Sequence, residues 1–206
     1  MTTNRFYYDI IIAGFGGQGV LAIGNLLAYA AMNEGRHVTY LPTYGVEMRG
    51  GTANCTVVIS SNEIGSPIVQ RPHASISMNL PSLLKYGSRV LPNGLLMVNS
   101  SLIDLKEVTR NDIELLAIPV NDIANENGNP RMANMIALGA FIEKTKLVEM
   151  SSVFNSLEKV FDERHHGLIP GNIKAIEIGA EYVKNNITPT LPPSHQRLCH
   201  NGEGEG

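Results

Sequence analysis

Residues 7–19 read YYDIIIAGFGGQG, a run of β-branched and aromatic residues that ends in a glycine-rich loop. The nearly continuous apolarity of residues 7–13 is typical of a strand buried on both faces, as in a parallel sheet. Beyond the loop, small or apolar residues recur every three or four positions and predict one buried face of a helix: Val20, Gly24, Leu27 and Ala31. This strand–loop–helix unit predicts an α/β fold.

The rest of the chain continues this alternation and then turns helical. Strand patterns cover residues 37–41, 53–59, 74–78, 95–99 and 115–120, with a short helix around residues 80–86. Pro42 is expected to stop the second strand, because proline cannot donate to a sheet ladder. From about residue 130 the patterns are helical, over residues 132–144, 150–164 and 168–184. We therefore expect an open, Rossmann-like, mostly parallel sheet with flanking helices and a C-terminal helical segment.

Composition limits the class of protein. The 206 residues are 43% hydrophobic, which is enough for a self-supporting core and predicts a single domain over residues 1–187. Residues 188–206 contain PTLPPS and end in NGEGEG, which cannot bury enough apolar area to offset the entropy of ordering, so we expect a flexible tail there. A net charge of −3 and the lack of tryptophan argue against nucleic-acid partners. No apolar run is long enough for a membrane span, and the chain is expected to be cytoplasmic.

Cysteines and histidines form no ligand pattern. The two cysteines, Cys55 and Cys199, have no cysteine or histidine at ligand spacing, which disfavours a disulfide framework and a metal centre. Adjacent helical side chains point about 100° apart, so His165 and His166 are expected to be solvated rather than to converge. His37 and His73 are interpreted as loop or strand-edge residues.

The loop at residues 14–19 has the glycine spacing of a dinucleotide-binding fingerprint. Its glycines permit a tight turn, close approach of a ligand and packing of the helix, and amides at a helix start favour an anion. The fingerprint also expects an acidic residue about 20 positions later, and residues 38–41 contain none, which weakens an NAD site. Two alternatives stay open: a tight turn without ligand, and capture of a phosphate or a partner's carboxylate.

A second glycine-rich stretch, residues 44–52, reads YGVEMRGGT. If both loops leave the carboxyl edge of the sheet, they face one crevice. The planar guanidinium of Arg49 is suited to a phosphate or carboxylate, and Glu47 could orient it. The alternative is a surface ion pair of these two residues, worth at most ~1 kcal/mol. The predicted cofactor-binding residues, with no catalytic and no metal-binding ones, are Gly14, Gly16, Gly17, Gln18, Gly19, Glu47, Arg49, Gly50 and Gly51.

The two loops together, in this order, resemble the γ subunit of 2-oxoacid:ferredoxin oxidoreductases, a family that includes the γ domain of pyruvate/ketoisovalerate oxidoreductases. The similarity runs from GFGGQG (residues 14–19) and YGVEMRGGTANC (residues 44–55) through IGSP (64–67), PNG (92–94) and NMIALG (134–139). It reaches Asn172 and Gly179 and covers about residues 8–185.

The resemblance implies that the chain works inside a complex and is not active alone. Such complexes oxidatively decarboxylate a 2-oxoacid to an acyl-coenzyme A and reduce ferredoxin. The partners expected are the α and β subunits, with a δ subunit as an open alternative, and ferredoxin through the complex. Thiamine diphosphate, iron–sulfur clusters and coenzyme A are expected on or with other subunits. No cofactor is assigned to this chain alone.

The substrate class rests on one loop. Residues 47–54, EMRGGTAN, resemble the 2-oxoglutarate and branched-chain (2-oxoisovalerate) types more than the pyruvate type. Three other hypotheses stay open: the small subunit of indolepyruvate ferredoxin oxidoreductase, a free-standing dinucleotide- or flavin-binding Rossmann protein, and an assembly scaffold whose glycine loops are only turns and whose helical face is buried by a partner.

Overall fold

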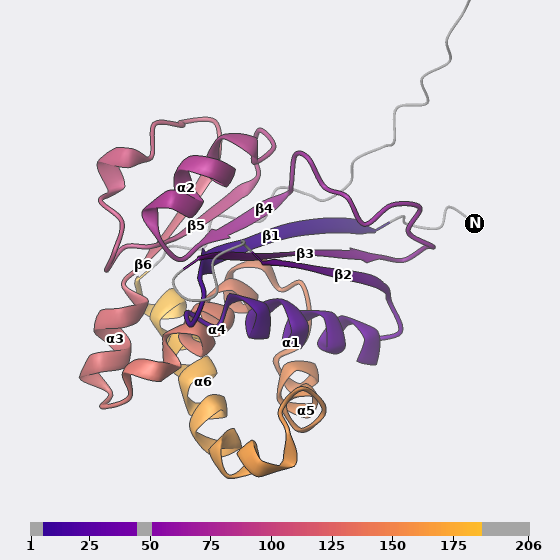
Figure 1. Cartoon of the computed structure of the whole chain (residues 1–206), viewed down its shortest axis with the longest axis vertical. Coiled ribbons are helices and arrows are strands. Elements are labelled where there is room, and N and C mark those ends of the chain that lie inside the picture. The colour runs from indigo at the N-terminus through magenta and orange to yellow at the C-terminus, as the bar shows by residue number, and fades with distance from the viewer. Residues whose placement is uncertain (1–5, 45–50, 187–206) are drawn as a thin grey trace, which may run out of the picture.

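The computed structural model describes residues 6–44 and 51–186 (Figure 1). The strands are β1 (Tyr7–Phe15), β2 (His37–Tyr44), β3 (Thr52–Ser60), β4 (Ala74–Ser77), β5 (Leu95–Asn99) and β6 (Glu114–Ile118). The α-helices are α1 (Val20–Asn33), α2 (Leu80–Tyr86), α3 (Val120–Glu126), α4 (Ala133–Thr145), α5 (Met150–Val160) and α6 (Ile169–Asn186). The predicted tail at residues 188–206 lies outside the described residues, as do Glu47, Arg49 and Gly50.

A six-stranded sheet in the order β2-β3-β1-β4-β5-β6 forms the centre of the fold. The pairs β1–β4, β4–β5 and β5–β6 are parallel, so the predicted open, mostly parallel α/β sheet is confirmed. Strand β3 runs antiparallel to both β1 and β2, which the strand patterns did not reveal. The cause is the short connection at residues 45–51, because parallel neighbours need a crossover of about a dozen residues or more.

Strand β2 continues through Pro42 to Tyr44, so the prediction that Pro42 ends this strand is wrong. In the ladder, Pro42 lies opposite Cys55 of β3. Because β2 is the outermost strand, one side of its backbone has no neighbouring strand, and a missing N–H is tolerated there.

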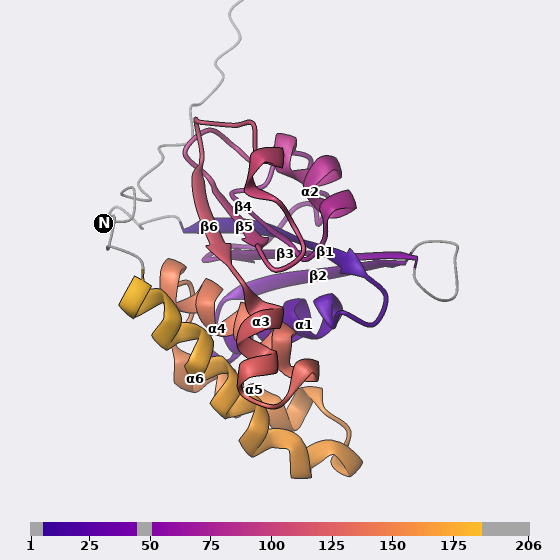
Figure 2. The same ribbon diagram turned by 90° about the vertical axis from the view of Figure 1, so that its left-hand side faces the viewer.

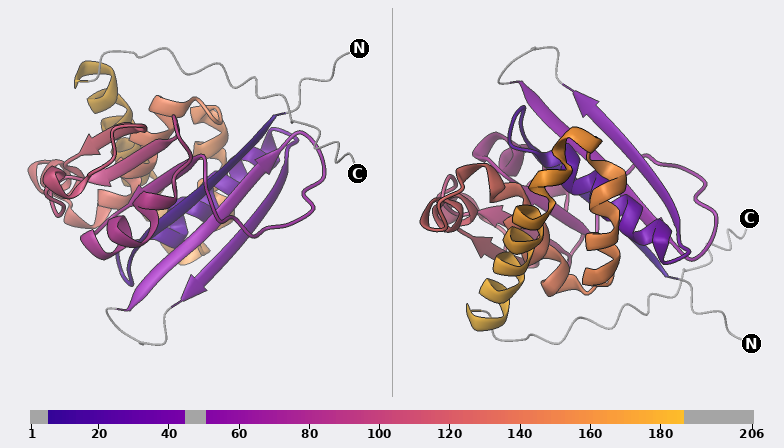
Figure 3. Two further views of the ribbon diagram at one scale, coloured as in Figure 1. Left: turned by 90° about the horizontal axis from the view of Figure 1, so that it is seen from above. Right: turned by 90° about the horizontal axis from the view of Figure 1, so that it is seen from below.

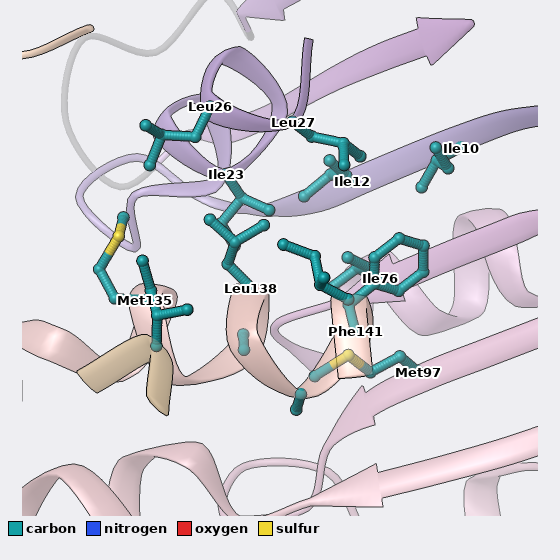
Figure 4. Close-up of a cluster of buried hydrophobic side chains, with 14 of the residues drawn as sticks. Ile10, Ile12, Ile23, Leu26, Leu27, Ile76, Met97, Met135, Leu138 and Phe141 are labelled. Atoms are coloured by element: carbon teal, nitrogen blue, oxygen red, sulfur yellow. The ribbon is translucent and has the colours of Figure 1, made fainter. Parts of the chain in front are cut away.

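The sheet has a hydrophobic layer on each face. On β1, Ile10 and Ile12 belong to the large core between the sheet and helices α1 and α4, which Figure 4 shows in close-up. Ile11 and Ala13 point to the other face and cluster with Tyr86 of α2. The alternation follows from the two-residue period of a strand, and it explains the uninterrupted apolar run in the sequence.

Helices α5 and α6 form an outer layer, with α5 packed on α1 and α6 packed on α4 (Figures 2 and 3). Two glycines permit the close contact of α4 and α6. A Cβ atom on Gly139 would lie 1.9 Å from the carbonyl oxygen of Ile176, and one on Gly179 would lie 2.0 Å from that of Ile136. Of the predicted C-terminal helical segment, α4 therefore lies on the sheet beside α1, and α5 and α6 are stacked on these two helices. Sequence patterns missed α3, a helix of 7 residues.

Helices α1 and α4 cover one face of the sheet, and α2 covers part of the other (Figures 1 and 3). Met135 of α4 is 1% exposed and belongs to the large core. Within the described ranges, no helix has the length and apolarity that a membrane crossing requires.

Candidate functional site

The two glycine-rich stretches meet at the carboxyl end of β1. The N–H of Gly16 donates a hydrogen bond of 2.9 Å to the carbonyl oxygen of Gly51. Phe15, the last residue of β1, pairs with Thr52, the first residue of β3. On the far side of β3, Tyr44 at the end of β2 pairs with Ala53. Both ends of the segment 45–50 therefore lie at the edge from which the loop 14–19 leaves.

The glycines of the first loop have different roles. Gly14 is buried, and a Cβ atom there would lie 2.7 Å from Gln18 Oε1 and 2.8 Å from Val20 Cγ1. Gly19 has φ of 70° and lies against Asn134 of α4, whose Nδ2 would be 2.3 Å from an added Cβ. Gly17 has φ of 96°, a conformation that side-chain-bearing residues rarely adopt. Gly14 and Gly19 thus serve turn and packing.

Phe15, Gly16 and Gly17 are the exposed residues of the loop. Among the residues that the structure describes, an added Cβ on Gly16 would meet only the Gly51 carbonyl oxygen, at 3.7 Å, and one on Gly17 would meet nothing within 4 Å. The Gly16 N–H is already paired with Gly51. To the residues that the structure describes, the N–H groups of Gly17 and Gly19 make no hydrogen bond. These two amides are the donors that the loop can offer to a ligand.

Four further amide side chains lie at the same carboxyl edge: Asn79, Asn99, Asn121 and Asn134. None of these four asparagines was predicted from the sequence as a site residue. A signal was present, because Asn99 ends the apolar strand β5 and Asn79 follows β4 directly after Met78. Polar residues at these positions of parallel strands tend to gather where ligands bind.

The site carries no redox group of its own in the described part of the chain. The described free cysteine, Cys55, lies in the core beneath α1, and burial raises the pKa of its thiol to about 12. A thiol of this kind stays protonated and unreactive at neutral pH. Among residues 6–44 and 51–186, no group of three His, Cys, Asp or Glu side chains is placed to hold a metal ion. The chemistry that this edge offers is hydrogen bonding through amides.

A second polar cluster lies at the opposite end of β1. Asp9 is a buried residue, 5% exposed. Its carboxylate accepts a hydrogen bond of 2.8 Å from the backbone N–H of His73 and lies 2.6 Å from Nδ1 of the same histidine. Tyr8 stacks on the same imidazole with ring centroids 5.3 Å apart. His73 precedes β4, as its interpretation as a strand-edge residue predicts, but its pairing with Asp9 was not predicted. This cluster fixes the end of the connection from β3 to β4 onto β1.

The adjacent histidines after α5 do not form a ligand pair. His165 is exposed. His166 Nε2 lies 3.1 Å from the carbonyl oxygen of Glu158 and 3.0 Å from that of Phe161, at the end of α5. The prediction that the two side chains do not converge is consistent with these contacts.

Residues 9–182 match the protein family described as pyruvate ferredoxin/flavodoxin oxidoreductase. The chain belongs to this family. The match includes both glycine-rich stretches, Asn134 and the glycines at the contact of α4 and α6. It confirms the resemblance on which the functional prediction rests.

Relatives and a solved structure agree with this assignment. The chain is 35% identical over 188 residues to the ketoisovalerate oxidoreductase subunit VorA of Methanothermobacter thermautotrophicus, with 87% of this chain and 37% of VorA covered. It is 33% identical over 181 residues to the 2-oxoglutarate synthase subunit KorC of the same organism, with 85% of this chain and 94% of KorC covered. The gamma subunit of a keto/oxoacid ferredoxin oxidoreductase from Geobacter sulfurreducens PCA has the same fold, with a TM-score of 0.73 at 25% identity over 87% of this chain and 98% of that one.

The two relatives differ in how much of their length this chain covers. The chain spans little more than a third of VorA and nearly the whole of KorC. Membership of the oxidoreductase family supports a subunit of a 2-oxoacid:ferredoxin oxidoreductase and not a free-standing dinucleotide- or flavin-binding protein.

Proposed function

We propose that this chain is the γ-type subunit of a 2-oxoacid:ferredoxin oxidoreductase complex and is inactive by itself. In this role the complex decarboxylates a 2-oxoacid, transfers the acyl group to coenzyme A and passes the electrons to ferredoxin. Thiamine diphosphate and the iron–sulfur clusters are then carried on or with other subunits, and the proposed partners are the α and β subunits, with a δ subunit as the further candidate. The family match over residues 9–182 supports the subunit role, and the observation that carries the proposal for its site is the Gly16–Gly51 hydrogen bond, which joins the two glycine-rich stretches at one edge of the sheet.

Residues 14–19 together with Gly51 form a rim at this edge of the sheet, which we assign to an anionic ligand of the complex. The amides of Gly17 and Gly19 would donate to the anion, and Arg49 would neutralise it with Glu47 holding the guanidinium. Coenzyme A is the ligand to test first because it carries a diphosphate and a further phosphate. The carboxylate of a partner subunit is the second candidate, since the same donors suit it.

The proposed substrate is 2-oxoglutarate or a branched-chain 2-oxoacid. The EMRGGTAN sequence of residues 47–54 supports this choice, and so do the names of the relatives, a 2-oxoglutarate synthase subunit and a ketoisovalerate oxidoreductase subunit. The two relatives have nearly equal identity to this chain, so sequence similarity does not separate the two acids.

The proposal is tested by isolating the chain under native conditions from its source cells. The expected result is a complex whose other chains carry iron and thiamine diphosphate. This complex should reduce ferredoxin with 2-oxoglutarate or 2-oxoisovalerate in the presence of coenzyme A, and more slowly with pyruvate. A chain that is recovered alone and binds NADH or FMN with micromolar affinity would contradict the proposal.

A further inference from the structure

Gln18 lies in the first glycine loop, but its side chain is bonded to the protein. Its Oε1 accepts hydrogen bonds from the N–H of Phe15 at 2.7 Å and from Asn79 Nδ2 at 3.1 Å. Its Nε2 donates to the carbonyl oxygen of Met78 at 3.2 Å. A glutamine amide offers two donor hydrogens and one acceptor oxygen, so most of its capacity is already used.

The bonds of Gln18 continue along the carboxyl edge of the sheet. The Met78 carbonyl oxygen also accepts from Asn99 Nδ2 at 3.3 Å, and Asn99 Nδ2 donates to Asn121 Oδ1 at 2.7 Å. Asn79 Oδ1 accepts from the N–H of Ser82 at 2.9 Å and so caps the start of α2. Asn79 and Asn99 are 3% and 1% exposed. Four side-chain amides, Gln18, Asn79, Asn99 and Asn121, therefore form one amide chain from the glycine loop to the start of α3.

This amide chain holds the shape of the loop. Gln18 bonds to Phe15 through its side chain, and its backbone N–H donates to the Phe15 carbonyl oxygen at 3.1 Å, which closes the turn from both sides. The closed turn sets the direction of the peptide groups at Gly17 and Gly19, whose N–H groups have no partner among the described residues. A buried network in which most donors and acceptors are paired is rigid.

We propose that Gln18 is a positioning residue and not a ligand contact. It holds the Gly17 and Gly19 amides in their binding orientation before the ligand arrives, and the amide chain through Asn79, Asn99 and Asn121 anchors it to the sheet. This inference rests on the proposed function, because it assumes that the rim binds an anionic ligand. It replaces the expectation that Gln18 itself contacts a cofactor.

The variant Gln18→Glu replaces the amide NH2 group, the hydrogen-bond donor of the side chain, with an oxygen. A glutamate keeps an oxygen that accepts from Phe15 and Asn79, but places a second oxygen against the Met78 carbonyl oxygen, where like partial charges repel. We expect the loop to leave its closed shape while the fold is retained. A glutamate also carries a negative charge that repels an anionic ligand directly, so Gln18→Met, which has similar length and neither an amide nor a charge, is measured beside it.

The measurement is the steady-state kinetics of the assembled complex with varied coenzyme A. For Gln18→Glu, and for Gln18→Met, we expect the KM for coenzyme A to rise about tenfold with kcat within about twofold, the signature of lost ground-state binding. Hydrogen exchange of the peptide that spans residues 14–19 should accelerate, while exchange of α6 stays unchanged. Asn127→Ala is the matched control, because Asn127 Nδ2 donates to the Ile123 carbonyl oxygen, outside the amide chain. It should alter neither quantity.

Gly16→Ala, which adds a methyl group to the rim itself, separates two claims: that the rim binds the ligand, and that Gln18 positions the rim. A raised KM in Gly16→Ala together with unchanged KM and exchange in both Gln18 variants overturns the positioning role and leaves the proposed function in place. Unchanged KM in all three variants overturns the assignment of the rim to coenzyme A as well, and with it the positioning role, while the subunit assignment is decided by the native isolation. Equal loss of kcat and of ferredoxin reduction in the Gln18 variants, with faster exchange throughout the chain, indicates general destabilisation and also rejects the positioning role.

Discussion

Gly24 of α1 faces Cys55 of β3 so closely that a Cβ atom on the glycine would lie 2.4 Å from the cysteine Sγ. The Sγ itself lies 3.6 Å from the Val20 carbonyl oxygen one turn earlier in α1. The helix therefore sits directly on the sheet at this point. Because α1 begins at the glycine loop, the contact also fixes the height of that loop above the edge of the sheet.

Gly24→Ala should destabilise the chain by about 1–3 kcal/mol, because the added methyl overlaps a buried sulfur atom in a packed core. Replacing Cys55 by alanine removes the sulfur. The double variant Gly24→Ala/Cys55→Ala should therefore be more stable than the sum of the single effects predicts, as measured by urea unfolding in a double-mutant cycle. Strict additivity would show that the two residues do not press on each other.

The buried thiol predicts a specific loss of stability at alkaline pH. Its folded-state pKa of about 12 lies above the ordinary value of 9.0, so the protonated thiol stabilises the fold fully below pH 9. This contribution is lost as the pH rises from 9 towards 12, by no more than about 1.4 kcal/mol per pH unit. The difference in unfolding free energy between the natural chain and Cys55→Ala should shrink over this range. A difference that is independent of pH would contradict the burial of the thiol.

The contact of α4 and α6 predicts intolerance of side chains at Gly139. An alanine there would place its Cβ 1.9 Å from the Ile176 carbonyl oxygen, and a backbone atom cannot turn aside as a side chain can. We expect Gly139→Ala to cost about 3 kcal/mol or more of unfolding free energy, at the upper end for overpacked cores. Gly167→Ala is the control, since no atom lies within 4 Å of its added Cβ. Similar unfolding midpoints for the two variants would refute the close crossing.

The pairing of Asp9 with His73 predicts that substitutions of Asp9 lower the free energy of unfolding by different amounts. Asp9→Asn keeps an acceptor oxygen for the His73 N–H and should cost less than about 1 kcal/mol. Asp9→Ala leaves that N–H without its partner and should cost about 1–3 kcal/mol more. Thermal unfolding at neutral pH measures both. Equal effects of the two variants would show that the carboxylate does not hold the β3–β4 connection.

Local sequence patterns predicted the strands and helices that are buried on one or both faces and have ordinary lengths. The apolar run at residues 7–13 became β1, and the three-to-four residue spacing after it became α1. The direction of β3 could not be read from its residues, because a buried strand has the same composition in parallel and antiparallel ladders. Only the short connection at residues 45–51 carried that information.

The candidate site was predicted in part. The two glycine-rich stretches were expected at one edge, and the Gly16–Gly51 bond is consistent with that expectation, while Arg49 and Glu47 lie outside the described residues. The amide chain was not predicted, because its direct bonds join residues far apart in the sequence: Gln18 and Asn79 are 61 positions apart, and Asn99 and Asn121 are 22 apart. Such bonds depend on strand order, which single residues do not encode. The Asp9–His73 pair, 64 positions apart, was missed for the same reason.

Gly16→Ala is the most direct test of whether the rim is a binding surface in the complex. Gly16 is exposed, its φ is not among the positive ones, and an added Cβ would lie in ordinary contact with the Gly51 carbonyl oxygen. The variant should therefore fold and unfold like the natural chain. In the assembled complex, the account predicts a KM for coenzyme A raised about tenfold or more, because the methyl group occupies the place where the ligand approaches. Natural KM and full turnover from an assembled Gly16→Ala complex would contradict it.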